Sequence, residues 1–273
     1  MLAIICGGGT YPLEIAKCCF NNKTDFVLAF ISNSYDASLN WPNVVSQTFE
    51  LGQIGGLVEF LKNYKVDTVI FAGFIERPNL FNLSLDELAS KWLLKIGLGA
   101  FSGDDGLLRS IAKLFEESGF KVVHPSEYIE NLIAHDLIMT DSQPTDRDTA
   151  DISKGIDVLT SLSPYDIGQS VIVENGLIIG IECVEGTDQL IARSKLLKKS
   201  DTGGVLVKLT KFGQDMRFDI PTIGLNTVKN CYNAGLRGIA IERGQCVFLN
   251  QKESINFANA NNMFIVTVEK KGN

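Results

Sequence analysis

The sequence predicts an α/β fold made of two domains, and three observations predict it. In residues 1–140, short apolar runs alternate with segments of helical spacing, which is the pattern of strands joined by crossover helices. In residues 141–273, the pair Asn175-Gly176 stands between two strand-like runs, which is a strong signal for a two-residue hairpin. The length of 273 residues is more typical of two ordinary domains than of one.

The elements of the first half follow from apolar periodicity and turn residues. The opening apolar run stops at Gly7-Gly8-Gly9, and Pro12 is well placed near the start of the next helix. The run at 66–71 is apolar with little polar alternation, as expected for a strand buried on both faces. We expect strands at 2–6, 26–31, 66–71 and 119–123 and helices at 13–20, 55–65, 85–94 and 104–118, which together predict a Rossmann-like parallel sheet covered on both faces.

The second half begins after a region that is rich in proline and polar residues. The run 141–151 is polar and turn-rich, so we place the domain boundary in about residues 137–150 and assign 1–140 and 141–273 to the two domains. The pattern beyond it indicates a mixed α/β domain with an antiparallel hairpin. We expect helices at 151–162, 186–199, 226–234 and 252–261 and strands at 170–174, 177–183, 204–209, 238–241, 245–249 and 263–268.

Composition and charge exclude several classes of protein. A formal net charge of −7 argues against a nucleic-acid binder that neutralises phosphates. With only two histidines, the chain contains neither a three-histidine metal site nor an HExxH zinc site. Six irregularly spaced cysteines without a CxxC motif indicate reduced thiols. No secretory signal and no apolar run of membrane-spanning length is visible, so we expect a cytoplasmic protein.

The basic residues are concentrated in one stretch of this acidic chain. Between Arg193 and Arg243, ten basic residues stand against four acidic ones. One interpretation is a solvated helix face. The other is a surface for an anion, either a phosphorylated ligand or acidic lipid headgroups.

Several short motifs carry candidate chemistry, each with a structural alternative. Gly7-Gly8-Gly9 could approach a phosphate at a helix N-terminus or could be a tight turn. Arg77, after the Ala72-Gly73 strand end, could hold a phosphate or lie on the surface. One carboxylate of Asp104-Asp105 fits a helix cap, which leaves the other for a ligand.

Two motifs of the second half have the same double interpretation. The residues Glu185-Gly186-Thr187-Asp188 follow a strand and could either cap a helix or face a cleft. Residues 208–224 place Asp215 and Asp219 among Lys208, Lys211 and Arg217. Such carboxylates can bind Mg²⁺ or activate water, or they can form surface ion pairs.

Four strings in this order closely resemble the LpxI-type UDP-2,3-diacylglucosamine pyrophosphatase family. They are VDTVIFAGFIERP, GDDGLLR, DIGQSVIVENGLIIGIECVEGTD and RFDIPTIGLNTVKNCYNAGLRGIAIERG, and the resemblance covers nearly the whole chain. It implies hydrolysis of UDP-2,3-diacylglucosamine to UMP and 2,3-diacylglucosamine 1-phosphate (lipid X) in lipid A biosynthesis. It also implies two domains with the ligand between them and a divalent cation, usually Mg²⁺.

The resemblance and the motifs together define the expected site. Asp219 is the implied catalytic residue, and Asp219 and Asp188 are the best candidates for metal ligands. The expected substrate-binding residues are Gly8, Gly9, Gly73, Arg77, Asp104, Asp105, Glu185, Gly186, Thr187, Asp188, Lys208 and Thr222.

The expected partner is a UDP-sugar lipid rather than a nucleic acid, met by transient contact with the inner face of the inner membrane. A homodimer is left open. The alternative function is a non-catalytic nucleotide-binding regulatory protein. A Rossmann-type oxidoreductase is disfavoured because the glycine run does not match GxGxxG.

Overall fold

A computed structural model describes residues 1–75, 83–97, 104–211, 217 and 220–270, without the side chains of 104 and 105. The chain groups into two compact units. The first contains Met1–Glu130 and Asp215–Asp219, and the second contains Asn131–Gln214 and Ile220–Asn273. That 1–140 and 141–273 are the two domains stays a prediction.

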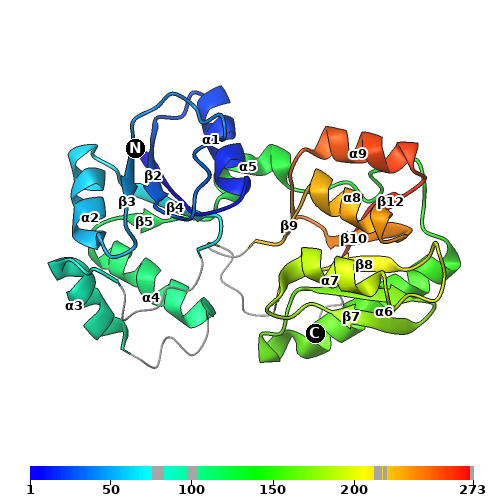
Figure 1. The fold of residues 1–273 in the computed structure, drawn as a ribbon. Coiled ribbons are helices and arrows are strands. Elements are labelled where there is room, and N and C mark those ends of the chain that lie inside the picture. The colour runs from blue at the N-terminus through cyan, green and yellow to red at the C-terminus, as the bar shows by residue number, and fades with distance from the viewer. Residues whose placement is uncertain (76–82, 98–103, 212–216, 218–219, 271–273) are drawn as a thin grey trace. The chain divides into compact units, whose positions relative to one another are not determined.

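The first unit is built on a five-stranded, fully parallel sheet with the order β3-β2-β1-β4-β5 (Figure 1). The predicted α/β class is confirmed here. Strand β3 was not predicted, because its side chains are mostly polar and exposed. The strands are β1 (Leu2–Cys6), β2 (Phe26–Ile31), β3 (Ser46–Phe49), β4 (Thr68–Ala72) and β5 (Lys121–Val122), and the helices are α1 (Tyr11–Asn21), α2 (Ile54–Asn63), α3 (Glu87–Ile96), α4 (Asp104–Glu117) and α5 (Ser126–Ile129).

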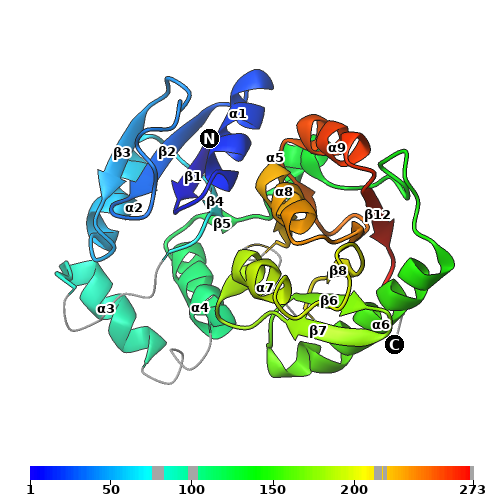
Figure 2. The same cartoon turned by 45° about the vertical axis from the view of Figure 1, so that its right-hand side comes forward.

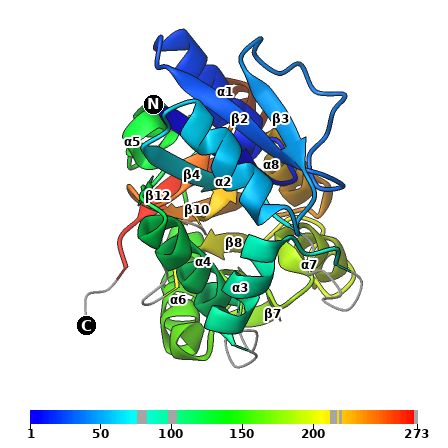
Figure 3. The same ribbon diagram turned by 90° about the vertical axis from the view of Figure 1, so that its left-hand side faces the viewer.

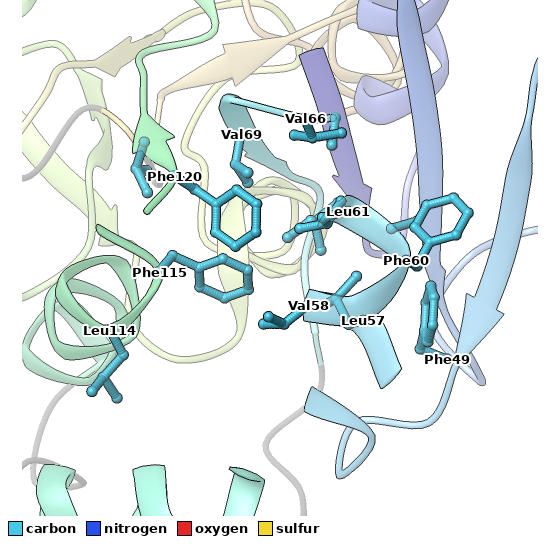
Figure 4. Close-up of a cluster of buried hydrophobic side chains, with 14 of the residues drawn as sticks. Phe49, Leu57, Val58, Phe60, Leu61, Val66, Val69, Leu114, Phe115 and Phe120 are labelled. Atoms are coloured by element: carbon cyan, nitrogen blue, oxygen red, sulfur yellow. The ribbon is translucent and has the colours of Figure 1, made fainter. Parts of the chain in front are cut away.

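The core of the first unit lies between this sheet and helices α2, α3 and α4. Figure 3 looks onto the face that α2 covers. Leu57 and Leu61 of α2 and Phe115 of α4 are buried in one cluster with Val69 of β4 and Phe120 (Figure 4). Because almost every residue of β1, β2 and β4 is apolar, this sheet can be buried on both faces.

The second unit has a five-stranded mixed sheet with the order β12-β10-β8-β6-β7. Strands β8, β10 and β12 are parallel, whereas β6 is antiparallel to both β7 and β8. The predicted hairpin is confirmed, with Asn175 and Gly176 at φ of 52° and 76°. The main strands are β6 (Ser170–Glu174), β7 (Leu177–Ile181), β8 (Val205–Lys208), β10 (Gly238–Glu242) and β12 (Phe264–Val268), with helices α6 (Asp146–Leu162), α7 (Gly186–Ser194), α8 (Leu225–Asn233) and α9 (Gln251–Ala260).

Three predictions for this half were wrong in detail. Helix α6 begins at Asp146 rather than 151, because Thr145 and Asp148 form a capping box. Helix α7 ends at Ser194 rather than 199. The strand predicted at 245–249 is shorter, since β11 covers only Val247–Phe248, and within the described residues it pairs with the short β9 (Thr222–Ile223).

Strand alternation separates the core of the second unit into two layers (Figure 2). Ile172 and Leu206 pack with α7, α8 and α9 on one face of the sheet. Their neighbours Val171 and Val207 pack with α6 on the other face. Helix α7 contacts both β7 and β6, so its first turn reaches the carboxyl edge of the sheet.

Candidate functional site

The loops that follow β1 and β4 meet at the carboxyl edge of the first sheet. The strand order reverses between these two neighbours, and such a switch point is where open α/β sheets bind ligands. The Gly7 amide donates to the carbonyl of Ala72 at 2.8 Å, and the Gly8 amide donates to that of Phe74 at 2.7 Å. The glycine loop and the Gly73-Phe74 loop therefore form one backbone-paired edge.

Glycine is required in this edge by close packing. A Cβ on Gly73 would lie 2.3 Å from the carbonyl oxygen of Gly8, and the φ of Gly73 is +83°. A Cβ on Gly8 would lie 2.7 Å from the ring of Phe74. Gly9 differs, because its φ is +84° but its nearest neighbour would be 3.6 Å away. Of the three predicted glycines in the first unit, Gly8, Gly9 and Gly73, Gly9 has the most open space for a ligand.

Two features lie beside the glycine loop, the exposed Phe74, which the sequence reasoning missed, and the helix N-terminus, which it predicted. The ring of Phe74 is 63% exposed although it covers Gly8. Helix α1 begins directly after the loop, and the Thr10 side chain makes no capping hydrogen bond. An exposed aromatic ring next to a helix N-terminus can serve a base and a phosphate, respectively.

In the second unit, a polar cluster lies on the α7 side of the carboxyl edge of β8. Lys208 ends β8 and is buried, and its ammonium group donates to the Thr187 hydroxyl at 2.7 Å. The Thr187 hydroxyl donates to Glu182 at 3.0 Å, and the hydroxyl of Ser170 lies 3.4 Å from it. The hydroxyl of Thr187 thus lies between the buried ammonium group of Lys208 and the buried carboxylate of Glu182. Lys208 and Thr187 are both predicted site residues, and the structure brings them into contact.

Glu182 and Ser170 are the members of this cluster that the sequence reasoning missed. Ser170 is the register partner of Lys208, and its carbonyl accepts the amide of Glu182 at 2.9 Å. The available signal was a carboxylate and a hydroxyl at the ends of two apolar strands. Within the described residues, the ammonium group of Lys208 has no partner besides Thr187, which leaves N–H groups for a phosphate.

Cys231 and Cys246, two buried cysteines that interact electrostatically with Lys208, remain protonated. Burial raises the pKa of Cys231, and the negative charge of Asp188 raises it further, whereas Lys208 lowers it. Burial raises the pKa of Cys246 to about 12. Because the thiolate is the reactive form, neither cysteine is a nucleophile at neutral pH.

The remaining predicted residues around α7 have different surroundings. Asp188 accepts a hydrogen bond from the side-chain amide of Asn230 at 3.1 Å. Glu185 forms an ion pair with Arg193 at 2.8 Å, and hydrogen bonding to Arg193 lowers the pKa of this carboxyl. Gly186 has a φ of +79° with no atom within 4 Å of an added Cβ. The Thr222 hydroxyl donates to the carbonyl of Ile220 at 3.0 Å.

The loop between β8 and β9 is anchored where it leaves the second sheet. Glu242, at the end of β10, accepts hydrogen bonds from the amide and the hydroxyl of Thr210 at 2.7 and 2.6 Å. Lys270 donates to the carbonyl of Thr210 as well. At the far end of the loop, the Pro221 carbonyl accepts the amide of Val247 at 2.9 Å.

Some predicted positions cannot be placed in this geometry. Arg77 and Asp219 lie outside the described residues. Asp104 and Asp105 are the first residues of α4, but their side chains are not among the described ones. In the described part of the chain, no three His, Cys, Asp or Glu residues are grouped so that they could hold a metal ion. These residues alone do not form a metal centre.

Comparison with known proteins covers both halves of the chain. The model of the LpxI N-terminal domain matches residues 1–132, and that of the LpxI C-terminal domain matches residues 135–266. The UDP-2,3-diacylglucosamine pyrophosphatase LpxI of Caulobacter vibrioides is 31% identical over 275 residues, which cover 98% of this chain and 97% of the relative. None of the helices in the described ranges is long and apolar enough to cross a membrane. With both domain models matched and a relative aligned from end to end, this chain belongs to the LpxI family.

Proposed function

We propose that this protein is a pyrophosphatase that hydrolyses the diphosphate of UDP-2,3-diacylglucosamine to UMP and 2,3-diacylglucosamine 1-phosphate (lipid X), a step of lipid A biosynthesis. The observation that carries the proposal is the end-to-end relation to a pyrophosphatase named for this substrate. In the reaction, water adds to one phosphorus and the bond from that phosphorus to the bridging oxygen breaks.

The first unit supplies features that suit the nucleotide. Gly9 and the start of α1 offer backbone N–H groups to a phosphate, and the helix dipole favours its negative charge. The exposed face of Phe74 suits stacking with the uracil ring. Gly8 and Gly73 act by keeping the two loops close enough for this edge to form. Arg77, Asp104 and Asp105 stay proposed substrate-binding residues on sequence grounds.

The second unit supplies charged groups for the diphosphate. Lys208 is buried, so its charge is weakly screened and interacts strongly with a phosphoryl oxygen. Thr187 and Glu182 fix the position of its ammonium group. Glu185, Gly186, Asp188 and Thr222 are proposed to line the same substrate site.

Asp219 is the proposed catalytic residue, acting as a general base that deprotonates the attacking water. The support for this assignment is that Asp219 stands in the string RFDIPTIG, at the position that matches the catalytic aspartate of the family by motif.

We also propose a requirement for a divalent cation, preferably Mg²⁺, with Asp219 and Asp188 as candidate ligands. Oxygen donors are the ligands that Mg²⁺ prefers, and a bound cation would neutralise charge on the diphosphate. The expected result is loss of turnover in excess EDTA and recovery when Mg²⁺ is added. Full turnover in EDTA would contradict the requirement without contradicting the pyrophosphatase activity.

The test of the proposed function is product analysis with the purified chain. UDP-2,3-diacylglucosamine in detergent micelles is incubated with Mg²⁺ in H₂¹⁸O, and UMP and lipid X are measured by mass spectrometry. We expect both products in equal amounts, and the product that contains ¹⁸O identifies the phosphorus that is attacked. Binding of the substrate without release of UMP would instead support the non-catalytic regulatory protein.

The lipid substrate places the proposed site of action at a membrane. We propose a cytoplasmic protein that contacts the inner face of the inner membrane transiently, without a membrane-spanning helix in its described part. A homodimer is the alternative assembly to a monomer, and sedimentation equilibrium distinguishes the two.

A further inference from the structure

An exposed apolar turn follows helix α7 in the second unit. Leu196 and Leu197 are 86% and 51% exposed, and they stand between the exposed lysines Lys195 and Lys199. Two adjacent exposed leucines are unfavourable, because their apolar surface is left in contact with water. We therefore expect this turn to be covered by a binding partner.

Several hydrogen bonds fix the position of this turn. The amide of Lys198 donates to the carbonyl of Ser194 at 3.1 Å, and its ammonium group donates to that of Ala234 at 3.1 Å. The carboxylate of Glu174 accepts the amide of Lys199 at 2.8 Å and the hydroxyl of Ser200. The fold thus holds the two leucines in a defined exposed position.

A third exposed leucine lies on the same side of the sheet. Leu177, at the start of β7, is 54% exposed and is the register partner of Glu174. Register partners project from the same face, and Glu174 reaches the turn after α7 from that face. Helix α7 also packs on β7 there (Figure 2). We name Leu177, Leu196 and Leu197 the leucine patch.

The exposed lysines of the basic stretch differ in their contacts, and Lys229 lies over the ring of Phe257 at 5.9 Å from its centroid. Lys208 is bound to Thr187, Lys211 pairs with Asp166 at 2.5 Å, and Arg237 pairs with Asp148 at 3.1 Å. Lys195 and Lys199, in contrast, have no side-chain partner within the described residues. The excess of positive charge read from the sequence is therefore available to a partner mainly next to the leucine patch.

The exposed Leu94 of α3 shows what an ordinary surface leucine looks like. It is 83% exposed, but the neighbouring Lys91 pairs with Glu87 at 2.6 Å and Lys95 pairs with Glu117 at 3.0 Å. Among the described residues of α3, Leu94 is the only large apolar side chain that is exposed, and the lysines on either side of it are paired, so these residues offer no combined apolar and cationic surface.

We propose that the leucine patch docks on the surface of an anionic lipid bilayer. The leucines enter the boundary between headgroups and acyl chains, and Lys195 and Lys199 contact lipid phosphates. This chemistry fits a bilayer better than a protein, because lysine is depleted in protein interfaces and leucine is under-represented among their hot spots. A second copy is disfavoured, since a symmetric contact would place lysines against lysines. The inference extends the proposed function, in which the substrate is itself a lipid.

The test is co-sedimentation of the full chain with vesicles that contain no UDP-sugar. Vesicles of phosphatidylcholine with 30% phosphatidylglycerol are compared with vesicles of phosphatidylcholine alone, at low and high salt. We expect binding to the anionic vesicles only, weakened by salt. Leu196→Ser/Leu197→Ser should lower the partition coefficient at least tenfold, and Lys195→Gln/Lys199→Gln should lower it about fivefold for each lysine.

Two controls separate the possible failures. Leu94→Ser, which removes a leucine of similar exposure, should change binding less than twofold. UMP release from micellar substrate should be the same in the patch variants and in the parent chain. If micellar turnover is absent in the parent chain, the proposed function fails while the vesicle result still decides the docking inference.

Three outcomes would overturn the docking inference. They are equal binding to neutral and anionic vesicles, wild-type binding by folded patch variants, and absence of binding by the parent chain. A dimer in sedimentation equilibrium that Leu196→Ser/Leu197→Ser dissociates would assign the leucine patch to a second copy instead.

Discussion

The two units each contain a five-stranded sheet, but they differ in what they bury. In the first unit, the described core is apolar, and the edge at β1 and β4 is shaped by glycine backbone. In the second unit, buried charged side chains such as Glu182, Lys208 and Glu242 lie at the carboxyl edge of the sheet. Every buried polar or charged residue among those described lies between Thr140 and Thr267.

This difference predicts which kinds of substitution should destabilise each unit. The closely packed glycine backbone at β1 and β4 leaves little room for added side-chain atoms. Substitution of these glycines by larger residues should therefore destabilise the first unit. In the second unit, removal of one partner of a buried charge should be destabilising, because the desolvation cost of the remaining charge is then not compensated by any interaction. Ionisable side chains at the edge of a sheet are also better suited to act on a reacting phosphate than an apolar backbone loop is.

The largest effect is expected in the loop that leaves β8. Asp219→Ala should lower turnover by about 10²–10⁴-fold, the usual effect of a general base. Substrate affinity should change little or increase, because a negative charge that faces the diphosphate is removed. Single-turnover kinetics and equilibrium binding measure the two effects separately.

Asp215→Ala is the matched control, since it removes a carboxylate from the same loop. We expect a milder loss, because Asp215 lies four residues before the aspartate that matches the family motif. The assignment of Asp219 fails if Asp219→Ala keeps more than about a tenth of the turnover. It fails as well if Asp215→Ala is the more damaging change in a folded protein.

The next effect concerns the buried charges of the second unit. Lys208→Met should lower the free energy of unfolding by about 3 kcal/mol, because Glu182 is left buried without a cation nearby. Adding Glu182→Gln should restore a large part of that loss but none of the turnover. Denaturant unfolding and UMP release test both statements. Additive losses of stability in the double variant would show that the two charges are not coupled.

In the first unit, two glycine substitutions should have unequal effects. Gly73→Ala combines a left-handed φ with a contact of 2.3 Å to the Gly8 carbonyl, so we expect a loss of about 3 kcal/mol. Gly9→Ala has the same strain but open space, and about 1 kcal/mol is expected. Thermal unfolding ranks the two variants. Equal destabilisation would show that φ alone, rather than the packing of the two loops, requires glycine there.

The smallest expected effect is on the pH dependence of stability, and it concerns Glu174, which holds the turn after α7 through hydrogen bonds. Burial of Glu174 acts to raise its pKa, but hydrogen bonds from the Lys199 amide and the Ser200 hydroxyl outweigh it and lower the pKa. A lowered folded-state pKa contributes stability above the unfolded value of about 4.3, and this stability is lost as pH falls through the folded value. Glu174→Gln should therefore flatten the acid side of the stability curve. An unchanged acid limb would contradict this role.

Much of the fold could be predicted because local signals agreed with the tertiary arrangement. The apolar runs that became β1, β2 and β12 are buried on both faces, so propensity and burial favoured the same state. The exposed strand β3 and the two-residue strand β9 were not distinguishable, since neither length nor period marks them. The basic stretch after α7 was predicted as helix because the lysines and leucines favour it, whereas Glu174 binds the amide of Lys199 outside the helix.

Individual residues of the candidate site could be predicted from the sequence, but the hydrogen bonds between their side chains could not. The sequence marked Thr187 and Lys208 separately, and neither period nor motif indicated that the two side chains would be 2.7 Å apart. Glu182 and Glu242 were missed because a carboxylate at a strand end usually faces water. Phe74 was missed because an aromatic residue in an apolar run is ordinarily part of a core.

The sequence by itself determined the α/β class, the hairpin at Asn175-Gly176 and the family, because these depend on local periodicity, turn chemistry and motif strings. The tertiary structure decided which charges are buried together and which remain available. Lys208 is bound inside the second unit while Lys195 and Lys199 stay at the surface, although all three belong to one basic stretch. The physical reason is that the pairing of charges depends on distances across neighbouring strands and helices, which the order of residues along the chain does not contain.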